Sequence, residues 1–185
     1  MISALELRRQ FLHLTFGVFL VILLYFRVFN VYHMIAILAA GLIMSYFCRN
    51  YEVPISSWVM AKFERENNLK IFPGRGPIYL MIGSISVLIL FPLKIALASM
   101  MILALGDAFS HIFGKLLSAK TYTHLKSVEG TMAGIVFSFF GALIFVNLFP
   151  AIVGSVLSML VENIKLDIDD NLLIPIIAAS VMSLV

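Results

Sequence analysis

The chain has 185 residues, of which 62% are hydrophobic and only 12% are charged, and its mean hydropathy is +1.05. Soluble domains carry about 25% charged residues, so this composition excludes a water-soluble fold and predicts a single all-α domain embedded in a membrane. The net charge of +3 does not indicate nucleic-acid binding, because no basic run interleaved with aromatic residues lies outside the apolar segments. The lone cysteine, Cys48, excludes an intramolecular disulfide and a cysteine-based metal site.

The first apolar stretch runs from Phe11 to Phe29, directly after Arg8 and Arg9. It is too long for the core of a signal peptide and no small-residue cleavage site follows it, so a retained first span is expected. A span needs about 20 mainly apolar residues. The sequence predicts about seven spans, at 10–29, 31–48, 77–93, 95–117, 131–149, 151–163 and 172–185, the last two being short.

The connecting loops carry very unequal charge. Of the 13 lysines and arginines, eleven fall on one side of the membrane and only Arg27 and Lys94 on the other. The positive-inside rule therefore predicts a cytoplasmic N-terminus. The 49–76, 115–130 and 164–171 loops then share the cytoplasmic face. The first of them has the pattern of a helix lying in the membrane interface.

The main polar feature is the segment GDAFSHIFGK at the end of the fourth predicted span. Asp107, His111 and Lys115 are spaced i, i+4, i+8, so a helix places them on one face. An aspartate inside a membrane costs roughly 2.5–3.5 kcal/mol and usually faces a bundle interior or an aqueous cavity. An interfacial position for Asp107 is the simpler alternative. Small residues that let a helix or a ligand approach lie beside this face: Gly106, Ser110 and Gly114.

The segment KSVEG opens the fifth predicted span. Ser127 is a candidate N-cap, and the free N–H groups behind it suit an anion together with Lys126. The Glu129 carboxylate is a ligand of the kind that Mg²⁺ prefers. Lys120 and His124, earlier in the same loop, are more simply explained by the positive-inside rule.

Two other segments carry candidate anion-binding residues. In FPGRGPIY, Gly74 and Gly76 allow a phosphate close to the backbone around Arg75, although a plain turn before a span has the same pattern. In ELRRQFLHLTFG, Arg9 and His13 share one helical face, and His13 is either part of a site or a satisfied core histidine.

The loop before the last span reads DIDDNLLIP. Its aspartates, Asp170 among them, are candidate metal ligands, and a solvated acidic turn is the equally plain alternative. Gly130 and Gly134 form a GxxxG that packs either within the chain or between chains, so a homo-oligomer stays open.

Taken in order, ELRRQFLH, PGRGPIY, GDAFSHIFGK with LKSVEGT, and DDNLLIP resemble the CTP-dependent lipid-alcohol kinases: dolichol kinase, phytol kinase and the CTP-using diacylglycerol kinase. The resemblance covers most of the chain, and it looks closer to the short phytol-kinase-like and prokaryotic members. The family has Arg-Lys where this chain has Arg9-Gln10. The resemblance implies transfer of the γ-phosphate of CTP to a lipid alcohol in the bilayer (phytol, geranylgeraniol, dolichol or diacylglycerol) at the cytoplasmic face.

The resemblance and the residue chemistry together give a candidate site. The expected catalytic residues are Asp107, Lys126 and Glu129, and Mg²⁺ is expected at Asp107, Glu129 and Asp170. CTP is expected to contact Arg9, Gly74, Arg75, Gly76, Gly114, Lys115, Ser127 and Gly130.

Two other functions remain open from the sequence. The same block is similar to the signature of phosphatidate cytidylyltransferases, which make a CDP-lipid, but here the lysine precedes the serine in KSVEG and no second lysine-threonine pair follows. An intramembrane aspartate also suits a transporter or channel. Against that, the polar groups gather on one face and inverted repeats are absent.

Overall fold

The computed structural model of the chain describes residues 3–51, 62, 71–117, 121–123, 126–164, 166 and 168–185. The predicted interfacial helix within 49–76 lies almost wholly outside these residues. The described part contains seven helices: α1 (Ala4–Tyr25), α2 (Val31–Asn50), α5 (Arg75–Leu90), α6 (Leu93–Leu117), α7 (Val128–Leu143), α8 (Leu148–Glu162) and α9 (Asp170–Met182). A short antiparallel hairpin of β1 (Thr121–Thr123) and β2 (Lys126–Ser127) joins α6 to α7 and was not predicted. The all-α prediction is otherwise confirmed.

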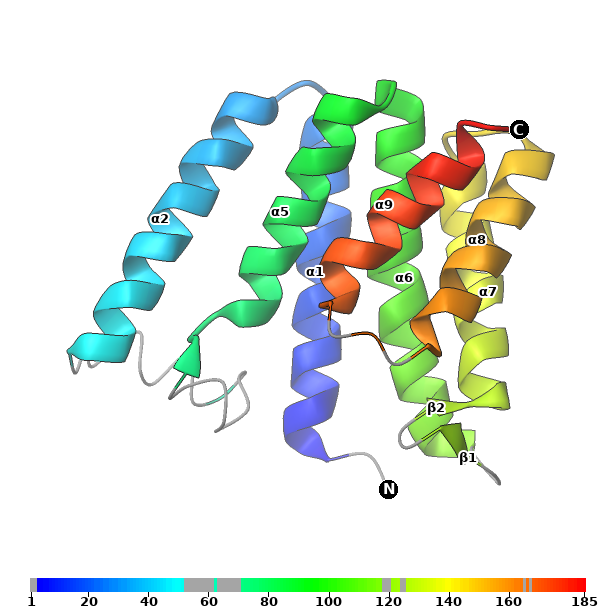
Figure 1. Ribbon diagram of the computed structural model, residues 1–185, viewed down its shortest axis with the longest axis horizontal. Helices are drawn as coiled ribbons and strands as arrows, with labels where there is room; N and C mark the ends of the chain where they lie inside the picture. The colour runs from blue at the N-terminus through cyan, green and yellow to red at the C-terminus, as the bar shows by residue number, and fades with distance from the viewer. Residues whose placement is uncertain are drawn as a thin grey trace.

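The helices run alternately up and down (Figure 1). One end of the bundle, here called the polar end, contains the first turn of α1, the last turns of α2, α6 and α8, the β1–β2 hairpin, and the first turns of α5, α7 and α9. The opposite end holds the short α1–α2, α5–α6 and α7–α8 connections. The segments that carry the candidate site residues therefore meet at one end of the molecule.

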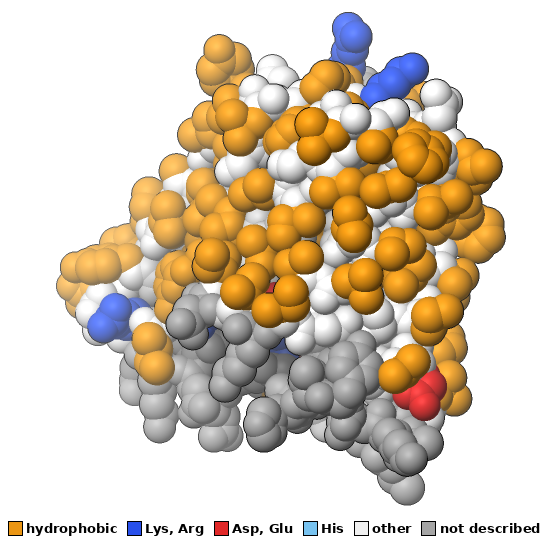
Figure 2. All heavy atoms as spheres, turned by 45° about the vertical axis from the view of Figure 1, so that its right-hand side comes forward, with side chains coloured by type: hydrophobic (Ala, Val, Ile, Leu, Met, Phe, Trp, Pro, Cys, Tyr) orange, Lys and Arg blue, Asp and Glu red, His pale blue; other side chains and the backbone are white. Residues whose placement is uncertain are grey.

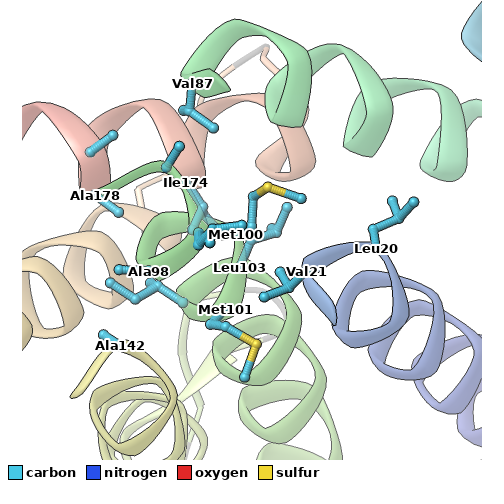
Figure 3. Packing of buried hydrophobic residues seen from close by; sticks show 14 of the residues in the cluster. Leu20, Val21, Val87, Ala98, Met100, Met101, Leu103, Ala142, Ile174 and Ala178 are labelled. Carbon is cyan, nitrogen blue, oxygen red and sulfur yellow. The ribbon is translucent and has the colours of Figure 1, made fainter. Parts of the chain in front are cut away.

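Helix α6 occupies the centre of the bundle. It packs against α1, α5, α7, α8 and α9, and its residues from Ala96 to Ala104 are all buried. Figure 3 shows Met100 and Leu103 of α6 surrounded by side chains of its neighbours. Helix α2 is peripheral, because it packs mainly on α5 and only Met34 and Ser45 of its residues are buried.

The apolar surface is that of a membrane protein. Three helices, α1, α2 and α6, are long and apolar enough to cross a bilayer by length and composition. The other four are apolar but have only 13–16 residues, which is about 20–24 Å against a hydrocarbon core of about 30 Å. Hydrophobic side chains are spread over much of the described part of the face seen in Figure 2. A bilayer is the environment that suits so much exposed apolar surface.

The predicted boundary between the spans 131–149 and 151–163 is wrong. Helix α7 ends at Leu143, where the N–H groups of Phe145 and Val146 both donate to the Ala142 carbonyl and close a turn. Helix α8 already begins at Leu148, so Pro150 lies in its first turn. Proline is tolerated there because the first N–H groups of a helix have no partner within it.

Helix α1 begins several residues before the predicted span 10–29. The Ser3 hydroxyl accepts a hydrogen bond from the Glu6 N–H at 3.2 Å and caps the helix. At the other end the helix stops at Tyr25, and Arg27 follows with φ = 56°, in the left-handed region. Since α1 starts at Ala4, its first turns place Glu6 and Arg9 on a regular helix at the polar end.

The GxxxG of α7 packs within the chain. A Cβ added at Gly130 would lie 2.6 Å from the Ser110 carbonyl oxygen and 2.9 Å from Gly114 Cα. A Cβ at Gly134 would lie 3.1 Å from the Gly106 carbonyl oxygen. The small residues of α6 and α7 therefore face each other and let the two backbones touch.

Candidate functional site

Asp107 lies in the buried part of α6 between two imidazoles. Its Oδ1 is 3.3 Å from Nε2 of His111, one turn later on the same helix. Its Oδ2 is 3.7 Å from Nε2 of His13, which belongs to α1. Asp107 is only 9% exposed, so its carboxylate faces the interior of the bundle. The predicted i, i+4 pairing of Asp107 and His111 is present.

Glu162 joins this pair from the last turn of α8. Its side chain is 3% exposed, and its Oε1 accepts a hydrogen bond from the Ser110 hydroxyl at 2.8 Å. Asp107, His111 and Glu162, here called the Asp107 cluster, each offer one ligand atom, and these atoms lie within 4.8 Å of one another. The carboxylate oxygens fit a hard divalent cation such as Mg²⁺. The donor set of the cluster therefore fits a divalent ion.

A pocket opens beside the cluster, where the ends of α6 and α8 meet the start of α7. Its lining includes the following residues of these three helices and of β2: Ser110, His111, Gly114, Ser127, Gly130 and Glu162. The absence of side chains at Gly114 and Gly130 keeps the backbone of both helices at its wall. The pocket is small, with room for about one water-sized group between the cluster and the first turn of α7.

The first turn of α7 is built as predicted. Ser127 is the N-cap, and its hydroxyl accepts a hydrogen bond from the Gly130 N–H at 3.1 Å. Lys126 belongs to β2, but the direction of its side chain lies outside the structural description, as do Lys120 and His124 altogether. The proposed contact of Lys126 with CTP stays a prediction.

Lys115 does not complete the Asp107 face as its spacing suggested. Its Nζ lies 3.7 Å from Oε2 of Glu6 on α1. Glu6 is 5% exposed and also accepts hydrogen bonds from Arg9 at 2.9 Å and from Gln10 at 3.3 Å. This Glu6 network holds two of the predicted CTP-binding cations, Arg9 and Lys115, on the seam between α1 and α6.

Arg75 is held at the start of α5. Its Nε donates to Oδ2 of Asp169 at 3.0 Å, and its guanidinium lies over the Tyr79 ring, 5.5 Å from the centroid. Asp169 is the N-cap of α9, and its other oxygen accepts from the Asn171 N–H. Gly74, with φ = 75°, forms the left-handed turn before α5, a conformation that glycine adopts without strain. Gly76 follows in the first turn of α5, close to Asn171.

Glu129 and Asp170 do not belong to the Asp107 cluster in the described part of the chain. Glu129 lies in the first turn of α7, and its Oε2 is buried with no hydrogen-bond partner among the described residues. Asp170 is the first residue of α9. Their expected roles as metal ligands stay predictions.

Glu162 and Glu6 were missed in the sequence. Ser110 and Glu162 are 52 positions apart, so no local spacing connects them. The available signal was one isolated carboxylate at the end of the apolar run VLSMLVEN. An acidic residue in such an apolar run usually faces a bundle interior, as Asp107 does.

The chain is similar to uncharacterized protein MJ1137 of Methanocaldococcus jannaschii. The two are 28% identical over 186 residues, which cover 96% of this chain and 93% of that protein. No protein-family model matches the chain, and no solved structure matches it. The name of the relative states no activity, so the chemistry of the site has to carry the functional argument.

Proposed function

We propose that this protein transfers the γ-phosphoryl group of CTP to the hydroxyl of a membrane lipid alcohol at the polar end of the bundle. The carrying observation is the buried Asp107 cluster, which lies in the second half of the apolar helix α6 beside a pocket at the start of α7. Buried carboxylates in an apolar helix suit a site that handles polyanions through a cation. The resemblance of the motifs to the CTP-dependent lipid-alcohol kinases suggests CTP as the phosphate donor and a lipid alcohol as the acceptor.

The proposed topology has seven spans and a cytoplasmic N-terminus. The alternating direction of the helices supports it, because the polar end then faces the cytosol, where CTP is available (Figure 1). Arg27 and Lys94, the two cations assigned to the outer face, belong to the α1–α2 connection and the start of α6 at the opposite end. The four short helices would cross a bilayer that is thinned around the protein.

Phosphoryl transfer requires positioning and charge neutralisation more than covalent chemistry. A divalent ion at Asp107, with Glu162 or Glu129 as further ligand, supplies neutralisation of the triphosphate when bound. Arg75 and Lys115, each paired with a carboxylate, would exchange that partner for phosphate oxygens, and Lys126 would join them.

The acceptor alcohol enters from the lipid side. Its hydroxyl oxygen forms a bond to the γ-phosphorus while the bond from that phosphorus to the bridging oxygen of CDP breaks. The hydroxyl proton passes to a carboxylate oxygen of the cluster, and CDP leaves. The apolar helices hold the hydrocarbon tail, so only the head of the lipid has to reach the polar end.

The decisive experiment uses the purified full chain in nanodiscs with CTP labelled in either the γ- or the α-phosphate. The acceptors are phytol, geranylgeraniol, longer polyprenols and diacylglycerol, each alone. We expect γ-label in the lipid product and none from α-labelled CTP. Transfer of α-label to a lipid phosphate would instead assign a cytidylyltransferase. Solute flux through proteoliposomes without nucleotide would favour a transporter.

A further inference from the structure

We propose that the Asp107 cluster binds a divalent transition-metal ion through imidazole nitrogen as well as carboxylate oxygen, so that Mn²⁺ binds more tightly than Mg²⁺. The ligands are Asp107, His111 and Glu162, with His13 beside them as a second nitrogen. This inference deepens the proposed function and rests on it only because both concern the same site. The ion is expected to bind without CTP or lipid.

The charges of the cluster favour a bound cation. Asp107 and Glu162 are 9% and 3% exposed, and the ligand atoms of the cluster lie within 4.8 Å of one another. Two carboxylates this close repel each other, and burial removes the water that would screen them. The ion pairs that the structure gives for Asp107 go to two histidines, which carry a full charge only when protonated. A divalent ion compensates both carboxylates and leaves both imidazoles neutral.

His13 supplies an independent sign of a ligand. Its Nε2 is buried, has no hydrogen-bond partner among the described residues and faces Asp107. The 3.7 Å between this nitrogen and Asp107 Oδ2 is too long for a hydrogen bond. Two ligands that share one ion through bonds of about 2.1 Å lie up to about 4.2 Å apart. The distance suits an ion shared by His13 and Asp107, and His13 lies at the edge of the cluster, outside the three residues whose ligand atoms are all within 4.8 Å.

The mixture of nitrogen and oxygen donors selects the kind of ion. Mg²⁺ takes oxygen ligands in near-ideal octahedral geometry and keeps several waters. Imidazole suits first-row transition metals, and Mn²⁺ also accepts carboxylates. The Ser110 hydroxyl donates to Glu162 Oε1 at 2.8 Å, so this carboxylate is already oriented before an ion arrives.

The test is Mn²⁺ binding to the metal-free full chain in nanodiscs, without CTP or lipid alcohol, followed by electron paramagnetic resonance. We expect one tightly bound Mn²⁺ per chain, at least about tenfold tighter than Mg²⁺ in competition, with ¹⁴N hyperfine coupling in pulsed spectra. Glu162→Gln keeps the size and the hydrogen-bonding capacity of the side chain and should weaken Mn²⁺ binding at least about tenfold. His111→Gln should weaken the ¹⁴N coupling, and the double variant with His13→Gln should abolish it.

His33→Gln is the matched control. His33 lies in the first turn of α2 and takes part in a capping box with Asn30, and glutamine can serve in the same motif. This variant should bind Mn²⁺ as the wild type does. Helicity and monodispersity of every variant are measured in the same preparation, so that misfolding is recognised.

The possible negative results of these experiments have different interpretations. Absence of tight Mn²⁺ binding in the wild type, or ¹⁴N coupling that survives in the double histidine variant, would overturn the metal assignment. If CTP turnover with Mg²⁺ were found alongside either result, the proposed function would stand without this inference. If Mn²⁺ binds with ¹⁴N coupling but the chain transfers no phosphate, the metal site would be supported and the kinase function would be rejected.

Discussion

Asp107 is a carboxylate that α6 carries into the packed part of the bundle, next to histidines from two helices. Changing it to asparagine keeps the shape of the side chain but removes one of two neighbouring buried charges. Folding should therefore survive the change, because repulsion with Glu162 is relieved. The negative charge that would hold a divalent ion is lost.

For Asp107→Asn we expect CTP turnover to fall at least about 100-fold, the usual effect of removing one preorganised electrostatic group from an active site. Insertion into membranes and helicity should match the wild type. The measurement is γ-label transfer to the best acceptor alcohol, with the amount of inserted protein determined in the same vesicles. Turnover near the wild-type rate would contradict the assignment of Asp107 as a catalytic residue.

Glu6 is the second buried carboxylate of the α1–α6 seam, and its main structural consequence is the tie to Lys115. The Lys115 side chain is 34% exposed, so solvent screens part of the attraction. A double-mutant cycle of Glu6→Gln and Lys115→Met, measured by unfolding in mixed detergent, should give a coupling of about 0.5–1.5 kcal/mol. A coupling of zero would mean that the pair does not stabilise the seam.

At the scale of elements, the contact of α6 with α7 determines the shape of the pocket. In Gly130→Ala the new methyl group would meet the Ser110 carbonyl and the Gly114 backbone, neither of which can rotate away. We expect a loss of about 1–3 kcal/mol of stability from overpacking, and weaker CTP binding as the two helices separate. Thermal unfolding and the KM for CTP are the measurements.

Gly41→Ala is the matched comparison for that variant. Gly41 lies in α2, and an added Cβ there would meet nothing within 4 Å. This change should leave the KM unaltered and stability equal or slightly higher, because alanine favours a helix over glycine. Equal losses in both variants would show that the α6–α7 contact does not decide the result.

The elements themselves were largely predictable, because long apolar runs dictate helices in a bilayer. The run from Val31 predicts α2 to within two residues at each end, and the spacing of Asp107 and His111 predicts their contact. The error at Pro150 arose from treating proline as a boundary, whereas the first turn of a helix accepts it. The local rule succeeds for Asp107 and His111 because their interaction lies within one helix.

At the scale of the whole molecule, the sequence left open whatever depends on which helices are neighbours. Gly130 and Gly134 could have packed between chains, and only the fold directs them to α6. Glu162 enters the Asp107 cluster because α8 descends beside α6, and Lys115 is drawn to Glu6 because α1 lies on the other side. These pairings join residues far apart along the chain, so no spacing rule could have produced them.

The orientation of the bundle in the membrane is the prediction that belongs to the whole molecule. With Cys48→Ala as background, Lys94→Cys reports the start of α6 and Arg49→Cys reports the end of α2, at opposite ends of the molecule. An impermeant maleimide should label Lys94→Cys in right-side-out vesicles and Arg49→Cys only in inverted ones, because the cation-rich end stays in the cytosol. Labelling both in one kind of vesicle would contradict seven alternating spans. The reversed pattern would place the Asp107 cluster away from cytosolic CTP and so exclude the proposed donor.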